Sequence, residues 1–288
     1  MGNVAGLPPW VVIDPLIQSW LIEDIGRGDR TTQGLLAGKV STVKALWVAK
    51  APGIIVGLPL AKRVFQLLDA KADFVAMVEE GQYCEPGKQI ATIEGTLDGL
   101  LTGERVALNL VMRLSGIATL TGKYAKQIAD LQARLVDTRK TTPGLRVLEK
   151  YASQLGGAIN HRMGLDDAVM IKDNHIAAAG GIGEAIALIR SNMPYPLTIE
   201  VETESLEQVE EALQHGADII MLDNMQPELM IVAVEKIRDR NRGIKIEASG
   251  NITLDNIRAV ALTGVDYIST SAPITQSKWL DLSMRVCL

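Results

Sequence analysis

Six short apolar runs, most of them separated by helix-like stretches, are the feature of this sequence that most restricts its fold. They span 135–136, 168–171, 197–201, 218–222, 244–246 and 265–268. Their starts lie roughly 20 to 35 residues apart, which is the length of a strand followed by a helix. Repeated units of this kind predict a parallel sheet with right-handed crossovers. A barrel and an open doubly wound sheet both satisfy the pattern.

Polar residues follow all six runs, and they decide between the two folds. They are Thr138, Arg139 and Lys140, then Lys172, Glu202, Asp223, Ser249 to Asn251, and Ser269 to Ser271. A barrel gathers such residues on its C-terminal rim, whereas an open sheet concentrates them at one crevice. We therefore expect a barrel, and because six strands are evident rather than the usual eight, an incomplete one.

The sequence before Ser115 predicts a separate α+β domain. A β-branched stretch at 40–57, with a turn at Pro52-Gly53, predicts one hairpin, and the runs 74–78 and 89–93 predict a second. Helical spacing is found at 58–68, 104–114 and 117–131. We also expect a helix over 10–20 that is broken at Pro15, followed by a glycine-rich loop over 21–32.

The composition excludes several classes of protein. A net charge of -5 and a pI near 5.4 argue against a nucleic-acid partner, which requires a basic face. Two cysteines in no metal-binding spacing indicate a reducing compartment. The first ten residues lack the pattern of a signal peptide, and no apolar run has the length of a membrane span. We therefore expect a cytoplasmic protein with no membrane partner.

Against this acidic background, cations gather between Asp137 and His175. They are Arg139, Lys140, Arg162 and Lys172, with His161 beside Arg162. A local basic pocket in an acidic protein suggests a small acidic ligand. Arginines favour carboxylates, because the guanidinium fork can bind both oxygens.

Acidic residues occupy the predicted barrel interior. Glu200 and Glu202 are two apart in a predicted strand, so both point to one face. Buried charges are costly unless they are paired or functional. Glu202 stands at the strand end, where we expect a role in the site. The alternative for Glu200 is an ion pair with Lys245 or Lys172.

Two small-residue turns predict a phosphate site. Ser249-Gly250-Asn251 precedes a helix expected at Thr253, and a second turn covers 269–272. Backbone amides at such turns and helix starts favour phosphate. Cations, acids and a phosphate cradle together suit a sugar-phosphate substrate with an anionic co-substrate.

Long motifs now identify a resemblance. DTRKTTPGLR, GGAINHRMGLDDAVMIKDNH, IEVE, MLDN and EASGNI, together with LIEDIGRGDRTT and GERVALNLVMRLSGIAT, closely resemble the quinolinate phosphoribosyltransferase family over residues 21–271. The resemblance implies an N-terminal α/β sandwich followed by an incomplete α/β barrel. It also implies transfer of a phosphoribosyl group from phosphoribosyl pyrophosphate to quinolinate with Mg2+, giving nicotinate mononucleotide, pyrophosphate and CO2 in de novo NAD biosynthesis.

The resemblance also implies roles for individual residues. The quinolinate pocket would comprise Arg105, Thr138, Arg139, His161, Arg162 and Lys172. Phosphoribosyl pyrophosphate would be held by Lys140, Glu202, Asp223, Ser249, Gly250, Asn251, Thr270, Ser271 and Ala272. Catalysis would rest on Lys140, Lys172, Glu202 and Asp223, and the two acids would also hold the metal. Ser271 and Gln276 depart from the family, which often has Gly and His at these positions.

The expected organisation follows from the same resemblance. Residues 1–114 would form the sandwich, residues 115–272 the barrel, and residues 273–288 would pack back on the sandwich. The chain would form a homodimer or a higher homo-oligomer in which Arg105 completes the site of a neighbouring subunit. Three alternatives stay open: a phosphoribosyltransferase of the molybdenum-transport-associated type with another acceptor, a Schiff-base aldolase using Lys172, and a non-catalytic anion-binding protein.

Overall fold

The computed structural model describes residues 6–38 and 41–287. They form two compact units: the described residues up to 122, with 142–156 and 276–287, make up the first, and residues 123–141 and 157–275 make up the second. The residues 1–5 considered for a signal peptide, and Val40 of the first predicted hairpin, lie outside the described residues. The predicted boundary after residue 114 falls within a helix, and the units divide after Gly122.

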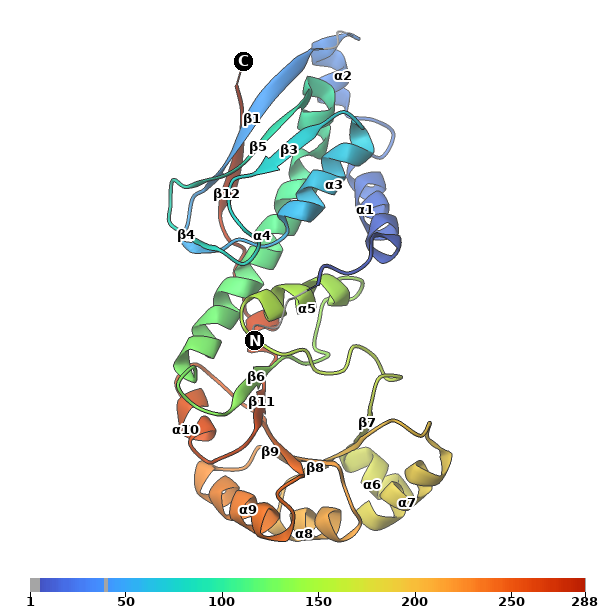
Figure 1. Cartoon of the computed structure of the whole chain (residues 1–288). Helices are drawn as coiled ribbons and strands as arrows, with labels where there is room; N and C mark the ends of the chain where they lie inside the picture. Colours follow the sequence, from blue (N-terminus) through green and yellow to red (C-terminus); the bar gives the residue numbers. More distant parts are fainter. Residues whose placement is uncertain (1–5, 39–40, 288) are drawn as a thin grey trace. The chain divides into compact units, whose positions relative to one another are not determined.

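An antiparallel four-stranded sheet forms the centre of the first unit (Figure 1). Its strands, in spatial order, are β12 (Leu282–Cys287), β1 (Thr42–Ala49), β5 (Gln89–Thr96) and β3 (Asp73–Ala76). The rings of Trp47, Phe65 and Phe74 pack together in its core, with centroids 5.8 to 6.3 Å apart. The unit also contains α1 (Trp10–Ile25), α2 (Arg30–Leu36), α3 (Leu58–Leu68), α5 (Arg146–Leu155) and most of α4 (Leu97–Gln127).

One of the two predicted hairpins is wrong. β1 pairs with β5 and β12, while β2 (Gly53–Ile54) pairs with β4 (Tyr83–Cys84). The eight residues of β1 need partners of similar length, and two-residue β2 cannot supply them, whereas β5 also has eight residues. The second prediction is confirmed, because β3 and β5 are antiparallel neighbours.

The helices at the start of the chain are longer than predicted. α1 continues through Pro15 to Ile25, because Ile13, Ile17 and Leu21 at four-residue spacing bury one face, and this offsets the hydrogen bond that proline removes. Much of the predicted loop at 21–32 is therefore helical. α2 begins after Asp29, whose carboxylate caps it by accepting from the Thr32 amide at 3.0 Å. The two helices predicted at 104–114 and 117–131 are parts of the single helix α4.

The second unit is an incomplete barrel of six parallel strands, as predicted (Figure 1). The strands are β6 (Arg134–Val136), β7 (Val169–Ile171), β8 (Ile199–Thr203), β9 (Ile219–Asp223), β10 (Lys245–Ser249) and β11 (Tyr267–Ser269). Their spatial order is β6-β11-β10-β9-β8-β7. β6 and β7 are therefore the edges, and within the described residues no pairing joins them. The segment 157–168 crosses this open side, starting beside β6 where Ile159 bridges to Val136.

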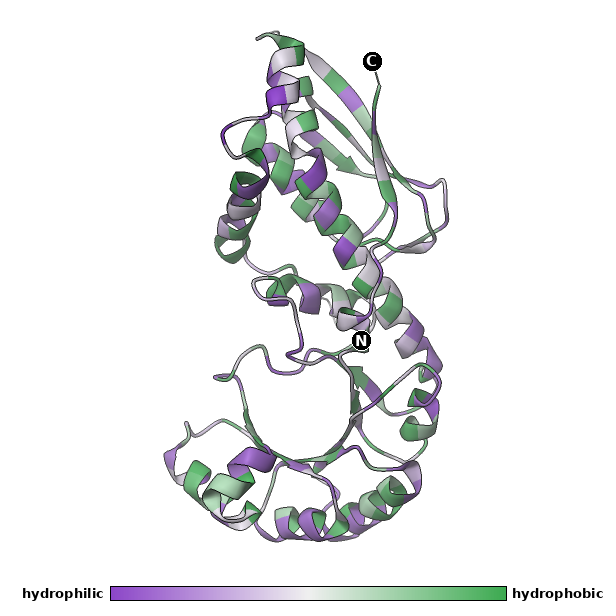
Figure 2. Ribbon diagram, turned by 180° about the vertical axis from the view of Figure 1, so that it is seen from behind, coloured by the Kyte–Doolittle hydropathy of each residue, from purple (hydrophilic) through white to green (hydrophobic). Residues whose placement is uncertain are grey.

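Helices surround the outside of this sheet. They are α6 (Asp173–Ala179), α7 (Ile182–Asn192), α8 (Leu206–Gln214), α9 (Pro227–Arg240) and α10 (Ile257–Ala261), while the short α11 (Ala272–Thr275) follows the carboxyl end of β11. α7, α8 and α9 each contain both hydrophobic and hydrophilic residues, as amphipathic helices do (Figure 2). α8, for example, buries Val209, Ala212 and Leu213. The helix expected at Thr253 begins at Ile257, because the Thr253 amide donates to the Asn256 side chain and a turn precedes the helix.

In the described part of the chain, no helix has both the length and the apolar character that crossing a membrane requires.

Candidate functional site

The parallel strands of the second unit bring the predicted residues to one edge. Their carboxyl ends all face the same way, so residues at or just after these ends line one rim. The rim carries Thr138, Arg139 and Lys140 after β6, Lys172 after β7, Glu202 near the end of β8, Asp223 and Ser249 as the last residues of β9 and β10, and Thr270 after β11. Arg105 lies elsewhere, exposed on α4 in the first unit.

Asp137 fixes the start of the segment that carries His161 and Arg162. Its buried carboxylate accepts from the Asn160 side chain at 2.6 Å and from the His161 amide at 2.9 Å. Asp137 directly follows β6, so the segment is tied to the end of that strand. Sequence reasoning missed this role, although the predicted strand end placed Asp137 beside the cations.

His161 lies against two buried glutamates. Its Nε2 is 3.2 Å from Glu200 Oε2 and 3.5 Å from Glu247 Oε2. Burial opposes the charged imidazole, but hydrogen bonds to Glu200 and Glu247 raise the pKa of His161 to about 10. Burial also raises the pKa of Glu200. The alternative weighed for Glu200, an ion pair with lysine, is not what forms: its ion-pair partner here is His161, and Lys245 is exposed.

Two guanidinium groups lie close together on the rim. Burial and the nearby Arg139 charge both lower the pKa of Arg162. The Nε of Arg139 is buried and, among the described residues, has no hydrogen-bond partner. Arg162 uses one nitrogen to donate to the Ala168 carbonyl at 2.8 Å. Two neighbouring cations with an unused buried donor describe a binding site for an anion.

Lys172 and Glu202 form an ion pair between the ends of β7 and β8. The Lys172 side chain is 44% exposed and the Glu202 side chain 13% exposed, so the lysine remains open to solvent. The backbone amide of Lys172 donates to His175 Nδ1 at 3.0 Å, which holds the residue at the start of α6.

Close packing joins the turns after β9 and β10. Asn224 Oδ1 accepts from the Asn251 side chain at 3.0 Å, and the Asn224 side chain donates to Asp223 at 2.6 Å. A Cβ at Gly250 would lie 2.2 Å from Asn224 Oδ1, and the backbone there has φ +91, so only glycine fits. The Ser249 to Asn251 turn therefore depends on Asn224, which was not among the predicted site residues.

The second predicted phosphate turn is held by its own threonine. The Thr270 hydroxyl lies 3.3 Å from the Ile252 carbonyl, to which it donates, and accepts from the Ala272 amide at 3.2 Å. Thr270 and Ala272 are buried, and Ser271 is half-buried. The side chain of Thr270 is thus occupied in shaping the turn.

Two groups of acids are candidates for a metal. Glu202 and Asp223 stand at the ends of neighbouring strands, which suits Mg2+, an ion commonly held by one or two carboxylates plus substrate phosphates. Glu200, Glu247 and His161 also bring ligand-type atoms within 4.8 Å of one another, the one such group of three among the described residues. The imidazole occupies hydrogen-bonding positions toward both glutamates, so we assign this second group to an ion-paired triad.

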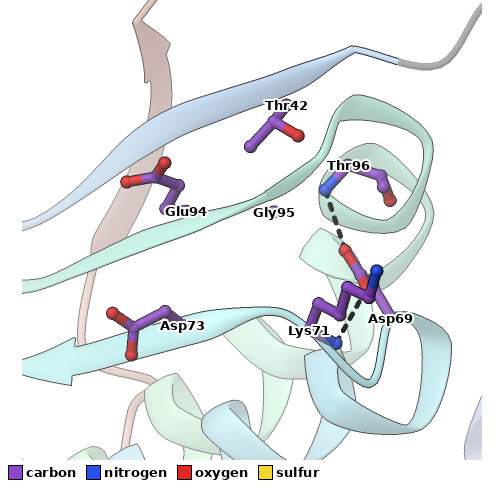
Figure 3. A pocket seen from close by; sticks show the side chains of 7 residues that line it. All are labelled: Thr42, Asp69, Lys71, Asp73, Glu94, Gly95 and Thr96. Carbon is purple, nitrogen blue, oxygen red and sulfur yellow. Dashed lines mark hydrogen bonds between the residues drawn. The ribbon is translucent and has the colours of Figure 1, made fainter.

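A surface pocket of about 340 Å³ lies in the first unit, and none of its lining residues is a predicted site residue (Figure 3). It is lined by Thr42, Asp69, Lys71, Asp73, Glu94, Gly95 and Thr96. Amide hydrogen bonds from Thr96 and Lys71 lower the pKa of Asp69. The Asp69 carboxylate thus serves the local backbone.

Comparison with known proteins establishes the family. Residues 28–115 match the quinolinate phosphoribosyl transferase N-terminal domain, and residues 117–285 match the C-terminal domain of the same enzyme. The chain belongs to the quinolinate phosphoribosyl transferase family. Its division into a small-sheet unit and an incomplete barrel is the fold that the family resemblance implied.

Relatives match this family member over nearly their whole length. A probable nicotinate-nucleotide pyrophosphorylase (carboxylating) from Synechocystis is 62% identical over 97% of this chain and 94% of that protein. The human nicotinate-nucleotide pyrophosphorylase (carboxylating) is 36% identical over 97% and 93%. The crystal structure of NadC from Streptococcus pyogenes is 40% identical, has a TM-score of 0.91, and covers 96% of each chain.

Proposed function

We propose that this enzyme transfers a phosphoribosyl group from phosphoribosyl pyrophosphate to quinolinate and releases CO2, giving nicotinate mononucleotide and pyrophosphate for de novo NAD biosynthesis. The curated relatives carry names of this activity, and each of them matches at least 95% of the chain. The observation on the molecule that supports the proposal most directly is the Arg139–Arg162 pair. A dicarboxylate supplies the two negative charges that these neighbouring cations lack.

The acceptor would bind where the cations converge. In this proposal Arg139 and Arg162 bind the quinolinate carboxylates, with His161, Thr138 and Lys172 around them. The unused Nε donor of Arg139 gains an acceptor when a carboxylate arrives. Binding also relieves the repulsion that lowers the pKa of Arg162.

The donor would bind along the opposite strands of the rim. Glu202 and Asp223 lie at the ends of β8 and β9, where carboxylates accept hydrogen bonds from ribose hydroxyls. The turns at Ser249 to Asn251 and Thr270 to Ala272 would hold the 5'-phosphate through their amides. Lys140 is exposed on the rim, and we propose that it binds the pyrophosphate, a role it would share with Lys172.

We propose that Mg2+ is held by Glu202 and Asp223. Bound there with pyrophosphate oxygens, the ion would supply neutralising charge for the leaving group. The chain's own residues position the two substrates so that the pyridine nitrogen faces the ribose carbon while the bond to pyrophosphate breaks and an oxocarbenium-like state develops. Catalysis of this kind rests on positioning and charge stabilisation. The cationic ring nitrogen then stabilises the carbanion left by CO2.

The proposal extends to assembly and location. We propose a homodimer or higher homo-oligomer in which Arg105 of one subunit completes the acceptor pocket of another. Arg105 is exposed on α4, and exposure leaves its guanidinium accessible to a neighbouring chain. Both cysteines, Cys84 and Cys287, are free, which suits the reducing cytoplasm.

The decisive experiment combines the purified protein with quinolinate, phosphoribosyl pyrophosphate and Mg2+. Formation of nicotinate mononucleotide, with equal amounts of pyrophosphate and CO2, supports the assignment. Arg139→Ala should abolish product formation, because it removes one of the paired cations. Borohydride inactivation in the presence of a carbonyl substrate would instead indicate a Schiff-base aldolase using Lys172.

A further inference from the structure

Two buried carboxylates lie one layer beneath the rim of the barrel. Glu200 precedes Glu202 by two residues on β8, and Glu247 precedes Ser249 by two residues on β10. Each therefore points to the same face as its rim neighbour, about 7 Å deeper along the strand. Glu200 is 3% exposed and Glu247 4% exposed. The strand between them is β9, so the two side chains approach one another across the interior.

His161 connects the two glutamates. Its Nε2 lies 3.2 Å from Glu200 and 3.5 Å from Glu247. The opposite ring nitrogen, Nδ1, accepts from the Arg162 amide at 2.8 Å. An Nδ1 acceptor requires the neutral ring with its proton on Nε2, whereas the charged ring that the raised pKa favours carries a proton on each nitrogen and keeps only the Nε2 contacts with the glutamates. The glutamates thus fix one side of the ring in either protonation state.

The position of Arg162 follows from that of His161. Asp137 holds the His161 amide, and His161 Nδ1 lies 2.8 Å from the Arg162 amide, so the backbone at both residues packs against groups that are fixed in the barrel. Glu200 also acts on Arg162 through its charge, which favours the protonated guanidinium. The glutamates and the anion-binding arginine therefore belong to one connected arrangement.

Stability alone does not account for the two acids. Buried carboxylates are costly, and apolar residues in the same place would often be at least as stable. The Oε1 atoms of Glu200 and Glu247 are buried and, among the described residues, have no hydrogen-bond partner. Two buried carboxylates that each leave one oxygen without a hydrogen bond point to a role in the binding site rather than in stability.

We propose that Glu200 and Glu247 are positioning residues of the acceptor pocket, holding the His161 imidazole so that the adjacent Arg162 stays oriented toward a substrate carboxylate. The inference rests on the proposed function, since it assumes that Arg162 binds quinolinate. Neither glutamate touches the substrate. Their contribution is to the affinity for the acceptor, with little effect on the phosphoribosyl donor.

The test compares three variants with the wild-type enzyme. Glu247→Met keeps a long side chain but removes the acceptor for His161 Nε2, and Glu247→Gln restores a neutral acceptor. Glu80→Gln is the matched control: Glu80 is half-buried in the first unit, where it accepts from the Gly57 and Leu58 amides and from Tyr151. Steady-state kinetics give KM for each substrate, and calorimetry gives the Kd of quinolinate.

Glu247→Met should raise the KM and Kd for quinolinate by about 10- to 100-fold, by analogy with the loss of metal affinity or activity when the partners that orient a metal-binding histidine are removed. The KM for phosphoribosyl pyrophosphate should stay within about twofold of wild type, and Glu247→Gln should recover most of the affinity. Glu80→Gln should lower the melting temperature without changing either KM. An unchanged quinolinate KM in Glu247→Met, with a melting temperature lowered as in Glu80→Gln, would overturn the proposal.

A second readout separates this proposal from the proposed function. The chain has three histidines, so nitrogen NMR of labelled histidine, assigned with His161→Gln, follows the His161 ring directly. Its Nε2 signal should shift in Glu247→Met and return toward wild type in Glu247→Gln, whether or not the wild-type enzyme makes nicotinate mononucleotide. An unmoved signal would count against the positioning role. Binding of one equivalent of a divalent ion by the wild-type protein, with loss of that binding in Glu247→Met, would also count against the positioning role.

Discussion

The Lys172 ammonium is paired with the Glu202 carboxylate at the ends of adjacent strands. Lys172 is proposed to bind the anionic groups of both substrates, and Glu202 is proposed to bind the ribose hydroxyls of phosphoribosyl pyrophosphate. A substrate anion that reaches Lys172 must therefore compete with Glu202 or share the lysine with it. This competition gives the acid a part in acceptor binding as well as donor binding.

Because Glu202 is paired with Lys172, a mutation of Asp223 is the better way to change the affinity for phosphoribosyl pyrophosphate without changing the affinity for quinolinate. Asp223→Asn should raise the KM for phosphoribosyl pyrophosphate by at least about tenfold, because a carboxylate hydrogen bond contributes more than a neutral one. The Kd of quinolinate should change by less than about twofold. Calorimetry with quinolinate alone measures the second quantity, and a comparable loss of both affinities would reject the assignment.

Acceptor choice should depend on the second carboxylate. We expect kcat/KM for quinolinate to exceed that for nicotinate by at least about a hundredfold, because nicotinate leaves one of the paired cations without an anion in a partly buried site. Competing the two acids in one reaction mixture measures the ratio. Comparable kcat/KM values would show that the Arg139–Arg162 pair does not select a dicarboxylate.

The shared site can be tested by complementation. Arg105→Ala and Lys140→Ala should each be nearly inactive alone. If Arg105 acts in trans, a mixed dimer contains one site with both residues intact, so unfolding and refolding the two variants together should return about a quarter of wild-type activity. Tagged subunits confirm that mixing has occurred. Mixed dimers without activity would contradict a shared site.

The His161 triad predicts how stability varies with pH. Its pKa is raised from 6.5 to about 10 in the folded chain. A group whose pKa is raised on folding stabilises the folded state. This contribution is complete at pH values below the pKa in the unfolded chain, and it is lost as the pH rises through the pKa in the folded chain. The melting-temperature difference between wild type and His161→Gln should therefore be greatest near pH 6 and shrink toward pH 10. His215→Gln, which removes an exposed histidine, is the control.

Gly116 permits a close backbone approach in the first unit. A Cβ at this position of α4 would lie 2.1 Å from the Lys278 carbonyl oxygen. Gly116→Ala should therefore lower the free energy of unfolding by about 1 to 3 kcal/mol or more, measured by urea denaturation. Gly34→Ala in α2 is the control, because nothing lies within 4 Å of its Cβ. It should be neutral or stabilising by up to about 1 kcal/mol.

The six barrel strands were predictable because each is a buried apolar run with polar residues at its end. The partners of β1 were not predictable, and a hairpin at 40–57 was predicted wrongly, because β1 pairs with strands far away in the sequence and no local pattern encodes that choice. Glu200 stood out through its spacing from Glu202. The same alternation applies to Glu247 and Ser249, but one acid before a small residue gave a weaker signal.

The contacts within the site depend on how distant segments meet. His161 was predicted as a cation for substrate, and its position between two acids follows from the path of 157–168 across the open side of the barrel. The role of Gly250 likewise depends on Asn224 from the neighbouring turn. Composition and periodicity identify which residues reach the rim, whereas their partners are determined by the curvature of the sheet.

The pairing of β12 with β1 has a consequence for how the chain is made. β12 spans residues 282–287 and is the last strand synthesised, yet it forms one edge of the sheet that begins at Thr42. Domains commonly fold as they leave the ribosome, N-terminal part first. Here β1 can pair with β5 early, but its other edge stays unpaired and exposed to other chains until translation has produced the entire barrel and β12. Chaperone protection of the nascent chain would be most valuable during that interval.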